Sequence, residues 1–215
     1  VYSLMGNHEL MNVMGDMNYV SYNNIQSSNN HITKNGNMIE DGLTARKYIF
    51  SPGNEISNFL ACTRKIALII GRNLFVHAGI VPQMIEKYNI DDLNIILTLF
   101  LLDELEDPTI FHDIFMSSKY SPLWTRDFGN MDSNNRCNEL MNPLEEVYKV
   151  GAIIVGHTPQ LNTGITSTCN NKIWLTDVAM SNAFNPIDKK YNLEGIKSIY
   201  RTAQVLQIKH NKDGS

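Results

Sequence analysis

Three short segments, far apart in the chain, carry the residue types that bind metal ions. They are Gly6-Asn7-His8-Glu9, Val76-His77-Ala78-Gly79 and Gly156-His157-Thr158-Pro159, and each follows an apolar run. A neutral imidazole at a strand end is a good ligand for zinc, iron or manganese. Asn7 adds an oxygen donor without negative charge. A single histidine of this kind is more often structural, but two of them together with Asn7 favour a metal site.

His8 has two interpretations at this point. Its imidazole is either a further metal ligand or a general acid that donates a proton to a leaving alkoxide. The remaining histidines do not follow a strand and a glycine, so we leave His31, His112 and His210 out of the site.

Apolar strands must position these side chains. Strands are predicted over residues 1–5, 66–70, 74–76, 152–155, 172–176 and 203–209. Gly71-Arg72-Asn73 reads as the turn of a hairpin between the second and the third of them. A glycine at a strand end lets the backbone turn sharply, so that the next side chain points into a shared pocket.

Helices are predicted between the strands. They cover residues 9–20, 56–65, 91–104 and 137–150, with Asp91 as the cap of the third. Residues 21–42 are predicted to be a polar loop excursion, residues 107–132 to be irregular, and residues 210–215 to be a tail. Strands that alternate with helices indicate the α/β class.

Composition narrows the class of protein. The 215 residues fit one globular domain, and 43% apolar with 19% charged residues suits a soluble fold. A net charge of −4 gives no basic footprint, so nucleic acid is not expected as a partner. The longest mainly apolar run, residues 93–102, is too short to span a membrane. Cys62, Cys137 and Cys169 are odd in number and lack CxxC spacing, which predicts neither a disulfide framework nor a thiolate zinc site and favours a cytoplasmic, reducing location.

In this order, the three histidine segments resemble the signatures of calcineurin-like metallophosphoesterases. Residues 4–12 (Leu-Met-Gly-Asn-His-Glu-Leu-Met-Asn) followed by Gly15-Asp16 narrow the resemblance, as do residues 121–126 (Ser-Pro-Leu-Trp-Thr-Arg) and 177–181 (Asp-Val-Ala-Met-Ser). These are similar to the Shewanella-like protein phosphatases, a branch of the PPP-type phosphatases. The resemblance runs from Leu4 to about Phe184. It implies an α/β two-sheet sandwich flanked by helices, with the N-terminal strands missing from this chain.

The resemblance also implies a role for each matching residue. Asn7, His77 and His157 would bind the second ion of a centre with two divalent metals (manganese, iron or zinc), and His8 would be the general acid. Arg126 would hold the phosphate, because a guanidinium fork suits two phosphoryl oxygens; the alternative is a surface cation. Asp177 is a candidate for orienting a histidine ligand. The implied reaction is hydrolysis of a phosphate monoester, of a phosphoprotein or phosphopeptide, by metal-activated water without a covalent phosphoenzyme.

The chain departs from the family pattern in one respect. The family also has Asp-x-His and Gly-Asp-x-x-Asp-Arg segments upstream of Gly-Asn-His-Glu, and neither occurs here. They would supply the shell of the first metal, the bridging carboxylate and the carboxylate partner of His8. We therefore expect residues 1–215 to be a single partial metallophosphatase domain that retains at most one metal site and is inactive alone. A fragment of a longer enzyme is preferred to a natural relic, because Val1 falls inside an expected core strand.

Two other functions remain open. One is a small-molecule hydrolase of the same superfamily that acts on dinucleoside polyphosphates. The other is a degenerate phosphatase-like module that binds a partner and has no activity.

Overall fold

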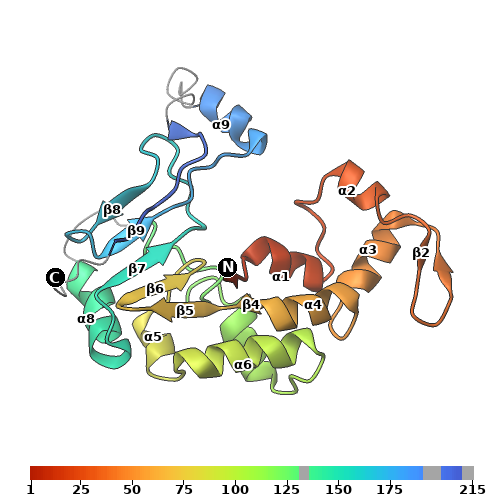
Figure 1. Cartoon of the computed structure of the whole chain (residues 1–215), viewed down its shortest axis with the longest axis horizontal. Helices are drawn as coiled ribbons and strands as arrows, with labels where there is room; N and C mark the ends of the chain where they lie inside the picture. The colour runs from red at the N-terminus through yellow and green to blue at the C-terminus, as the bar shows by residue number, and fades with distance from the viewer. Residues whose placement is uncertain (131–135, 191–199, 210–215) are drawn as a thin grey trace.

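A five-stranded sheet forms the centre of the protein. The computed structural model describes residues 1–130, 136–190 and 200–209. The strand order is β5-β6-β7-β9-β8 (Figure 1). The strands are β5 (Ala67–Ile70), β6 (Asn73–Val76), β7 (Ala152–Val155), β8 (Thr166–Thr168) and β9 (Ile173–Leu175). The strands β6, β7 and β9 are parallel, whereas β5 and β8 run antiparallel to their neighbours, so the ends of β6 and β7 lie at the same edge.

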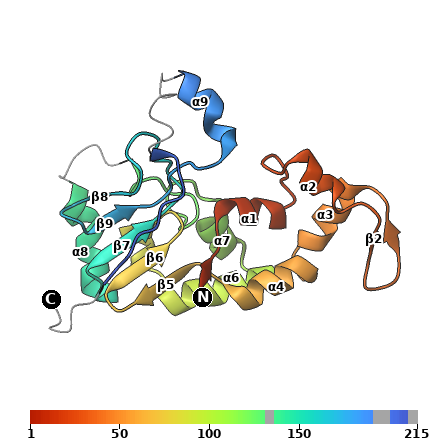
Figure 2. The same ribbon diagram turned by 45° about the horizontal axis from the view of Figure 1, so that its top comes forward.

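Helices cover one face of this sheet and create the core. Figures 1 and 2 show α5 (Pro82–Ile85), α6 (Ile90–Leu101) and α8 (Cys137–Tyr148) on the same side of it. Leu74, Ile153 and Ile173 lie in register across β6, β7 and β9, and all three are fully buried in one cluster with apolar residues of α6 and α8. Burial of these side chains is the main favourable contribution to folding.

The N-terminal part of the chain extends away from the large sheet. β1 (Ser3–Leu4) pairs in parallel with β4 (Arg64–Lys65) and leads into α1 (Asn7–Val13). Residues 21–41, without a buried side chain, contain α2 (Tyr22–Gln26) and the antiparallel pair β2 (His31–Ile32) and β3 (Met38–Ile39). The other elements are α3 (Gly42–Phe50), α4 (Glu55–Thr63), α7 (Pro108–Phe111), a π-helix (His112–Met116), a 3₁₀ helix (Asn182–Phe184) and α9 (Asn185–Lys190).

The α/β class and the β5–β6 hairpin are confirmed. The helix predicted over residues 9–20 is too long, because the chain turns at Gly15, whose φ is 78°. Asp91 is not the cap of α6; the side chain of Asn89 accepts the Asp92 N–H at 2.9 Å instead. The strand predicted over residues 203–209 is wrong, since this segment does not pair with a strand in the described part of the chain. Residues 210–215, the predicted tail, lie outside the described residues.

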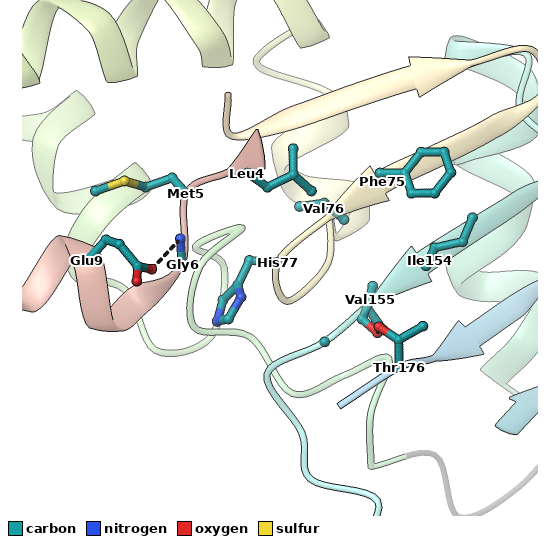
Figure 3. Close-up of a pocket in the computed structure, with 11 residues that line it drawn as sticks. Leu4, Met5, Gly6, Glu9, Phe75, Val76, His77, Ile154, Val155 and Thr176 are labelled. Carbon is teal, nitrogen blue, oxygen red and sulfur yellow. Dashed lines mark hydrogen bonds between the residues drawn. The ribbon is translucent and has the colours of Figure 1, made fainter. Parts of the chain in front are cut away.

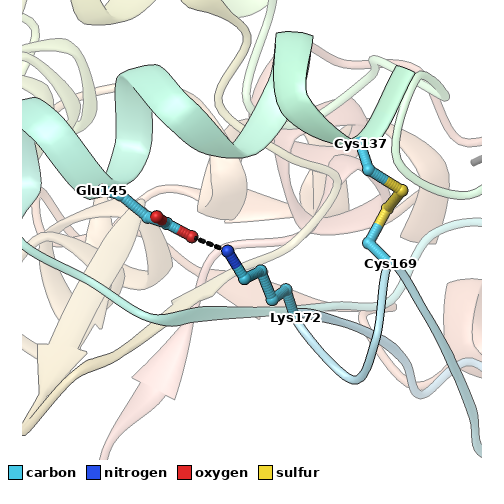
Figure 4. Close-up of a disulfide and its surroundings, with 4 residues drawn as sticks. All are labelled: Cys137, Glu145, Cys169 and Lys172. Atoms are coloured by element: carbon cyan, nitrogen blue, oxygen red, sulfur yellow. Dashed lines mark hydrogen bonds and ion pairs between the residues drawn. A yellow bond between two sulfur atoms is a disulfide. The ribbon is translucent and has the colours of Figure 1, made fainter. Parts of the chain in front are cut away.

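The prediction against a disulfide is also wrong. Cys137 and Cys169 are joined, and the bond ties the start of α8 to the turn between β8 and β9 (Figure 4). Beside it, Lys172 forms an ion pair with Glu145. The two cysteines are 32 positions apart, so their pairing depends on the folding of the sheet and not on local spacing. A disulfide is typical of an oxidising compartment. The cysteines therefore no longer support the cytoplasmic prediction.

In the part of the chain that the structure describes, every helix is too short or too polar to cross a membrane.

The disulfide predicts a measurable contribution to stability. Replacing both Cys137 and Cys169 with serine should lower the free energy of unfolding by about 3 kcal/mol, because the cross-link restricts the unfolded chain. Urea denaturation without reductant measures this difference, and Cys62→Ser, at an exposed position, is the control. Alkylation of all three thiols in the unreduced, unfolded chain would contradict the pairing.

Because of Tyr148 at the end of α8, we expect the folded protein to lose stability at high pH. Its hydroxyl donates to the Tyr88 carbonyl at 2.6 Å, and burial, with a smaller effect of Asp92, raises the pKa of Tyr148 to about 12. Between pH 10 and about 12 the unfolded chain loses this proton while the folded chain keeps it, so stability falls as the pH rises. Tyr148→Phe should cost about 1 kcal/mol at neutral pH and make this decline shallower. Equal pH slopes in urea titrations of the two proteins would contradict the prediction.

Candidate metal centre

Three potential ligand atoms converge where β6, β7 and α1 meet. His77 Nε2 lies 2.8 Å from Asn7 Oδ1 and 3.2 Å from His157 Nδ1. Asn7 and His157 are both buried, with 8% and 9% of their surface exposed. The structure thus brings together the three residues that the sequence predicts as metal ligands, although they are far apart in the chain.

Parallel pairing of β6 and β7 places the two histidines side by side. Each strand ends one or two residues before its histidine, at Val76 and Val155. Beyond the strands, the Gly156 N–H donates to the His77 carbonyl at 2.8 Å. The Thr176 N–H, just after β9, donates to the Val155 carbonyl at 2.8 Å. The backbone of the sheet therefore fixes the distance between the two imidazoles.

His157 occupies an unusual backbone conformation. Its φ is 62°, in the left-handed region that residues other than glycine rarely adopt. The Thr158 N–H donates to the Gly156 carbonyl at 2.6 Å, which closes a tight three-residue turn centred on His157. Such a turn is strained and persists only when its surroundings hold it. In this turn, Nδ1 of the His157 imidazole lies 3.2 Å from His77 Nε2.

The segment 121–126 holds His157 in place. His157 Nε2 lies 3.1 Å from the Trp124 carbonyl, which can only accept a hydrogen bond. This contact places the proton on Nε2 and leaves the lone pair of Nδ1 facing His77, as in metal sites where a carbonyl orients a histidine ligand. The Arg126 guanidinium donates from Nη1 to the His157 carbonyl at 3.1 Å. The Ala78 N–H donates to the Pro122 carbonyl at 2.9 Å, so the same segment also supports the His77 loop.

Gly6 and Glu9 fix the position of Asn7. The Gly6 N–H donates to Glu9 Oε2 at 3.1 Å, which caps the start of α1 (Figure 3). A Cβ atom at residue 6 would lie 2.6 Å from Glu9 Oε2 and 3.4 Å from the His77 ring. A larger residue before Asn7 would therefore displace the Glu9 carboxylate from its capping position.

Burial keeps both imidazoles neutral. It lowers the pKa of His77 to about 3, and electrostatic effects of His157 and other nearby basic groups, Arg126 among them, act in the same direction. Burial and then Arg126 lower the pKa of His157 to about 4, while the Trp124 carbonyl and Asp177 oppose this change. Both rings are therefore neutral at neutral pH, as metal ligands must be. His77 Nε2 faces two acceptors, Asn7 Oδ1 and His157 Nδ1, so without metal it carries a ring proton that a bound ion would displace to Nδ1.

The donor set fits a divalent metal ion. Ligand atoms that each lie about 2.1 Å from one ion are separated by roughly 3 Å, and the atoms of this cluster have that spacing. Two imidazoles and an amide oxygen suit manganese, iron or zinc. This set is neutral and contains no carboxylate. Within the described residues, no group of three His, Cys, Asp or Glu side chains is arranged to hold a metal.

The other predicted site residues lie around this cluster. Arg126 is exposed, and its Nη1 lies 3.5 Å from Thr158 Oγ1. His8 is exposed in the first turn of α1, with its ring stacked on Tyr19. Asp177 does not hydrogen-bond a histidine in the structure; its Oδ1 accepts the Ala179 N–H at 2.9 Å. Its influence on His157 is electrostatic only.

Sequence reasoning missed three contributors. The Trp124 carbonyl orients His157, a role that the sequence analysis gave to Asp177. A backbone group leaves no signal in the sequence. Glu9, three residues after Gly6, follows the spacing of a helix-capping pair and could have been identified. Tyr19 lies in the region predicted as helix, which hid its return toward His8.

A pocket of about 310 Å³ opens beside the cluster (Figure 3). Its lining includes the polar side chains of Glu9, His77 and Thr176 and apolar residues such as Phe75 and Ile154. It lies between β1 and the ends of β6 and β7, and His77 is the one proposed ligand in its lining.

Comparisons with known proteins show which family the chain resembles. A model of the calcineurin-like phosphoesterase family matches residues 1–161. The uncharacterized protein R398 of Acanthamoeba polyphaga mimivirus is 34% identical over 99% of the chain and 89% of its own length. Shewanella-like protein phosphatase 2 of Arabidopsis thaliana is 24% identical over 84% of the chain and 53% of its own length. Among solved structures, a mutant cold-active protein tyrosine phosphatase superposes with a TM-score of 0.61 at 21% identity, over 82% of the chain and 49% of that protein.

The structural match shows that the fold is shared, and the chain spans about half the length of the Arabidopsis relative and of the solved structure. The family match covers most of the chain and includes all three predicted ligands, and the mimiviral relative covers nearly all of it. The chain therefore belongs to the calcineurin-like phosphoesterase family.

Proposed function

We propose that this chain forms the second-metal half of an enzyme that hydrolyses phosphate monoesters of proteins. The convergence of Asn7, His77 and His157 at 2.8 and 3.2 Å carries this proposal. The fold itself does not require two histidines at this position, one of them in a strained turn. Strained residues of this kind cluster at functional sites.

The proposed roles follow from where the side chains lie. The three ligands would bind one divalent ion, which would neutralise phosphate charge and lower the pKa of a bound water. Arg126 would bind phosphoryl oxygens from the exposed side of the His157 loop. His8 would donate a proton to the departing oxygen. Asp177 would counter the positive charge of Arg126 near His157.

A second metal ion requires ligands from outside the described residues. We propose that a preceding part of the complete protein supplies them, including a bridging carboxylate and a partner for His8. Two observations support this: the ligand set here is entirely neutral, and the pocket of about 310 Å³ leaves space beside it. The chain also spans only about half of the Arabidopsis phosphatase. On this proposal the chain alone holds at most one ion and does not turn over substrate.

The proposed substrates are phosphoproteins or phosphopeptides. The support comes from the names of the relatives, which include Shewanella-like protein phosphatases and a protein tyrosine phosphatase. A panel of phosphopeptides against dinucleoside polyphosphates, assayed with the complete protein and Mn²⁺, tests this class. If the protein prefers dinucleoside polyphosphates, it is instead a small-molecule hydrolase of the same superfamily.

A non-catalytic binding module is the second candidate. The absence of a carboxylate from the described ligand cluster favours it. Folded complete protein that binds a divalent ion but does not hydrolyse phosphotyrosine, phosphoserine or p-nitrophenyl phosphate would support this candidate over the enzyme.

Two substitutions of His157 should have the same effect on metal binding but different effects on stability. In the complete protein, His157→Ala and His157→Gly should both lose the second metal and nearly all turnover. His157→Gly should nevertheless be the more stable variant by about 1 kcal/mol, because alanine keeps the left-handed strain and glycine does not. Metal analysis and thermal unfolding in EDTA measure the two effects. A variant that keeps both metal and rate would refute the site, and a more stable alanine variant would refute the strain.

Substitution of His8 should lower the rate of hydrolysis without lowering the metal content of the protein. His8→Asn should slow hydrolysis of phenyl phosphate by roughly a hundredfold or more, since this leaving group needs a proton. The metal content should stay the same because His8 is not in the ligand cluster. Steady-state kinetics beside metal analysis checks both statements, and loss of one metal ion would instead make His8 a ligand.

A further inference from the structure

The ring of Tyr19 stacks on the imidazole of His8. The ring centroids are 4.7 Å apart and the planes are inclined by only 11°. Offset parallel stacking is one of the preferred arrangements of aromatic pairs. Both residues are exposed, with Tyr19 72% exposed, so burial in the core does not account for the contact.

The loop after α1 is built to return Tyr19 to His8. The chain leaves the helix at Gly15, whose φ of 78° suits glycine, and the Asp16 N–H donates to the Met11 carbonyl at 2.8 Å. Asp16 Oδ1 then accepts the Asn18 N–H at 3.0 Å, a local turn in which an aspartate folds the backbone. These contacts give a structural reason for the Gly15-Asp16 pair. They carry the aromatic ring back to the first turn of the helix.

Apart from the stack on Tyr19, the contacts of His8 hold its backbone and not its imidazole. Its carbonyl accepts a hydrogen bond from Asn12 Nδ2 at 2.9 Å, and Asn12 Oδ1 accepts one from Arg46 Nε at 2.9 Å, so the backbone is well held. Among the residues that the structure describes, no side chain hydrogen-bonds the imidazole itself. Stacking is therefore what restrains the plane of the ring.

His8 lies beside the ligand cluster, because it follows Asn7 directly in the first turn of α1 and Asn7 Oδ1 is 2.8 Å from His77 Nε2. A proton donor must be held in the orientation of the reacting atom, because a small misplacement costs a large part of the rate. A freely rotating imidazole at this edge would spend only part of its time in a productive orientation.

We propose that Tyr19 is a positioning residue that holds the imidazole of His8 by stacking, and so sets how efficiently His8 protonates the leaving oxygen. This inference rests on the general-acid role of His8 in the proposed function. The π-face of the ring performs the role, and the phenolic hydroxyl is not needed. Phenylalanine should therefore replace tyrosine, and alanine should not.

The first test measures the stack without activity. In the 215-residue chain with labelled histidines, an aromatic ring over the imidazole shifts the His8 ring protons upfield, and His8→Asn identifies these signals. Tyr19→Ala should move them downfield, whereas Tyr19→Phe and the control Tyr22→Ala, at a position 73% exposed, should leave them in place. Unmoved signals in Tyr19→Ala would overturn the proposal.

The second test compares leaving groups in the complete protein with its metals. Tyr19→Ala should lower kcat for phenyl phosphate about tenfold and leave KM unchanged. It should change kcat for p-nitrophenyl phosphate little, because that leaving group departs without a proton. Tyr19→Phe should restore the wild-type kcat for phenyl phosphate, and Tyr22→Ala should not change it.

The outcomes separate this proposal from the proposed function. Moved His8 signals with an unchanged rate on phenyl phosphate in Tyr19→Ala, beside a slow His8→Asn, would overturn the positioning role alone. An unchanged rate in His8→Asn would overturn the general-acid role, and the positioning role with it. Equal loss on both substrates in Tyr19→Ala would also overturn the proposal, since stacking on a proton donor affects only the poor leaving group.

Discussion

The site depends on the parallel pairing of β6 and β7. Because both strands end at the same edge, one hydrogen bond of 2.8 Å from Gly156 to the His77 carbonyl fixes the spacing of two imidazoles from residues eighty positions apart. The buried face of the same strands anchors them in the core through Leu74 and Ile153. The core therefore supplies the rigidity that a preorganised ligand set requires.

Neutral histidines and local strain follow from this constraint. The two imidazoles lie 3.2 Å apart, with His157 buried and His77 half-buried, and burial lowers the pKa of each. His157 reaches its position only through a left-handed turn. The segment 121–126 stabilises that turn through the Trp124 carbonyl and Arg126, and Ser121 at its start is fully buried with its hydroxyl on the Ile114 carbonyl. Stability of the fold is thus used to hold a conformation that is suited to binding.

The sequence predicts the strands that have strong local signals. The bounds of β7 agree with its apolar run. An apolar run followed by glycine located the Asn7 and His157 loops, and an apolar run alone located the His77 loop. Features that depend on tertiary contacts were missed. The Cys137–Cys169 pair has no local spacing signal, and residues 203–209 have an apolar pattern but no partner strand among the described residues. Asp177 has the right residue type, yet the backbone of Trp124 makes the contact with His157 that was expected of it.

The most direct test of the account is a Co²⁺ titration of the 215-residue chain with labelled histidines, followed by NMR of the imidazole signals. The ligand cluster predicts that His77 and His157 signals shift strongly or disappear at about one equivalent, while those of His31 and His112 persist. It also predicts that Asn7→Ala weakens this binding. Unchanged signals of His77 and His157 in a folded chain saturated with Co²⁺ would contradict the metal centre, and with it the proposed chemistry.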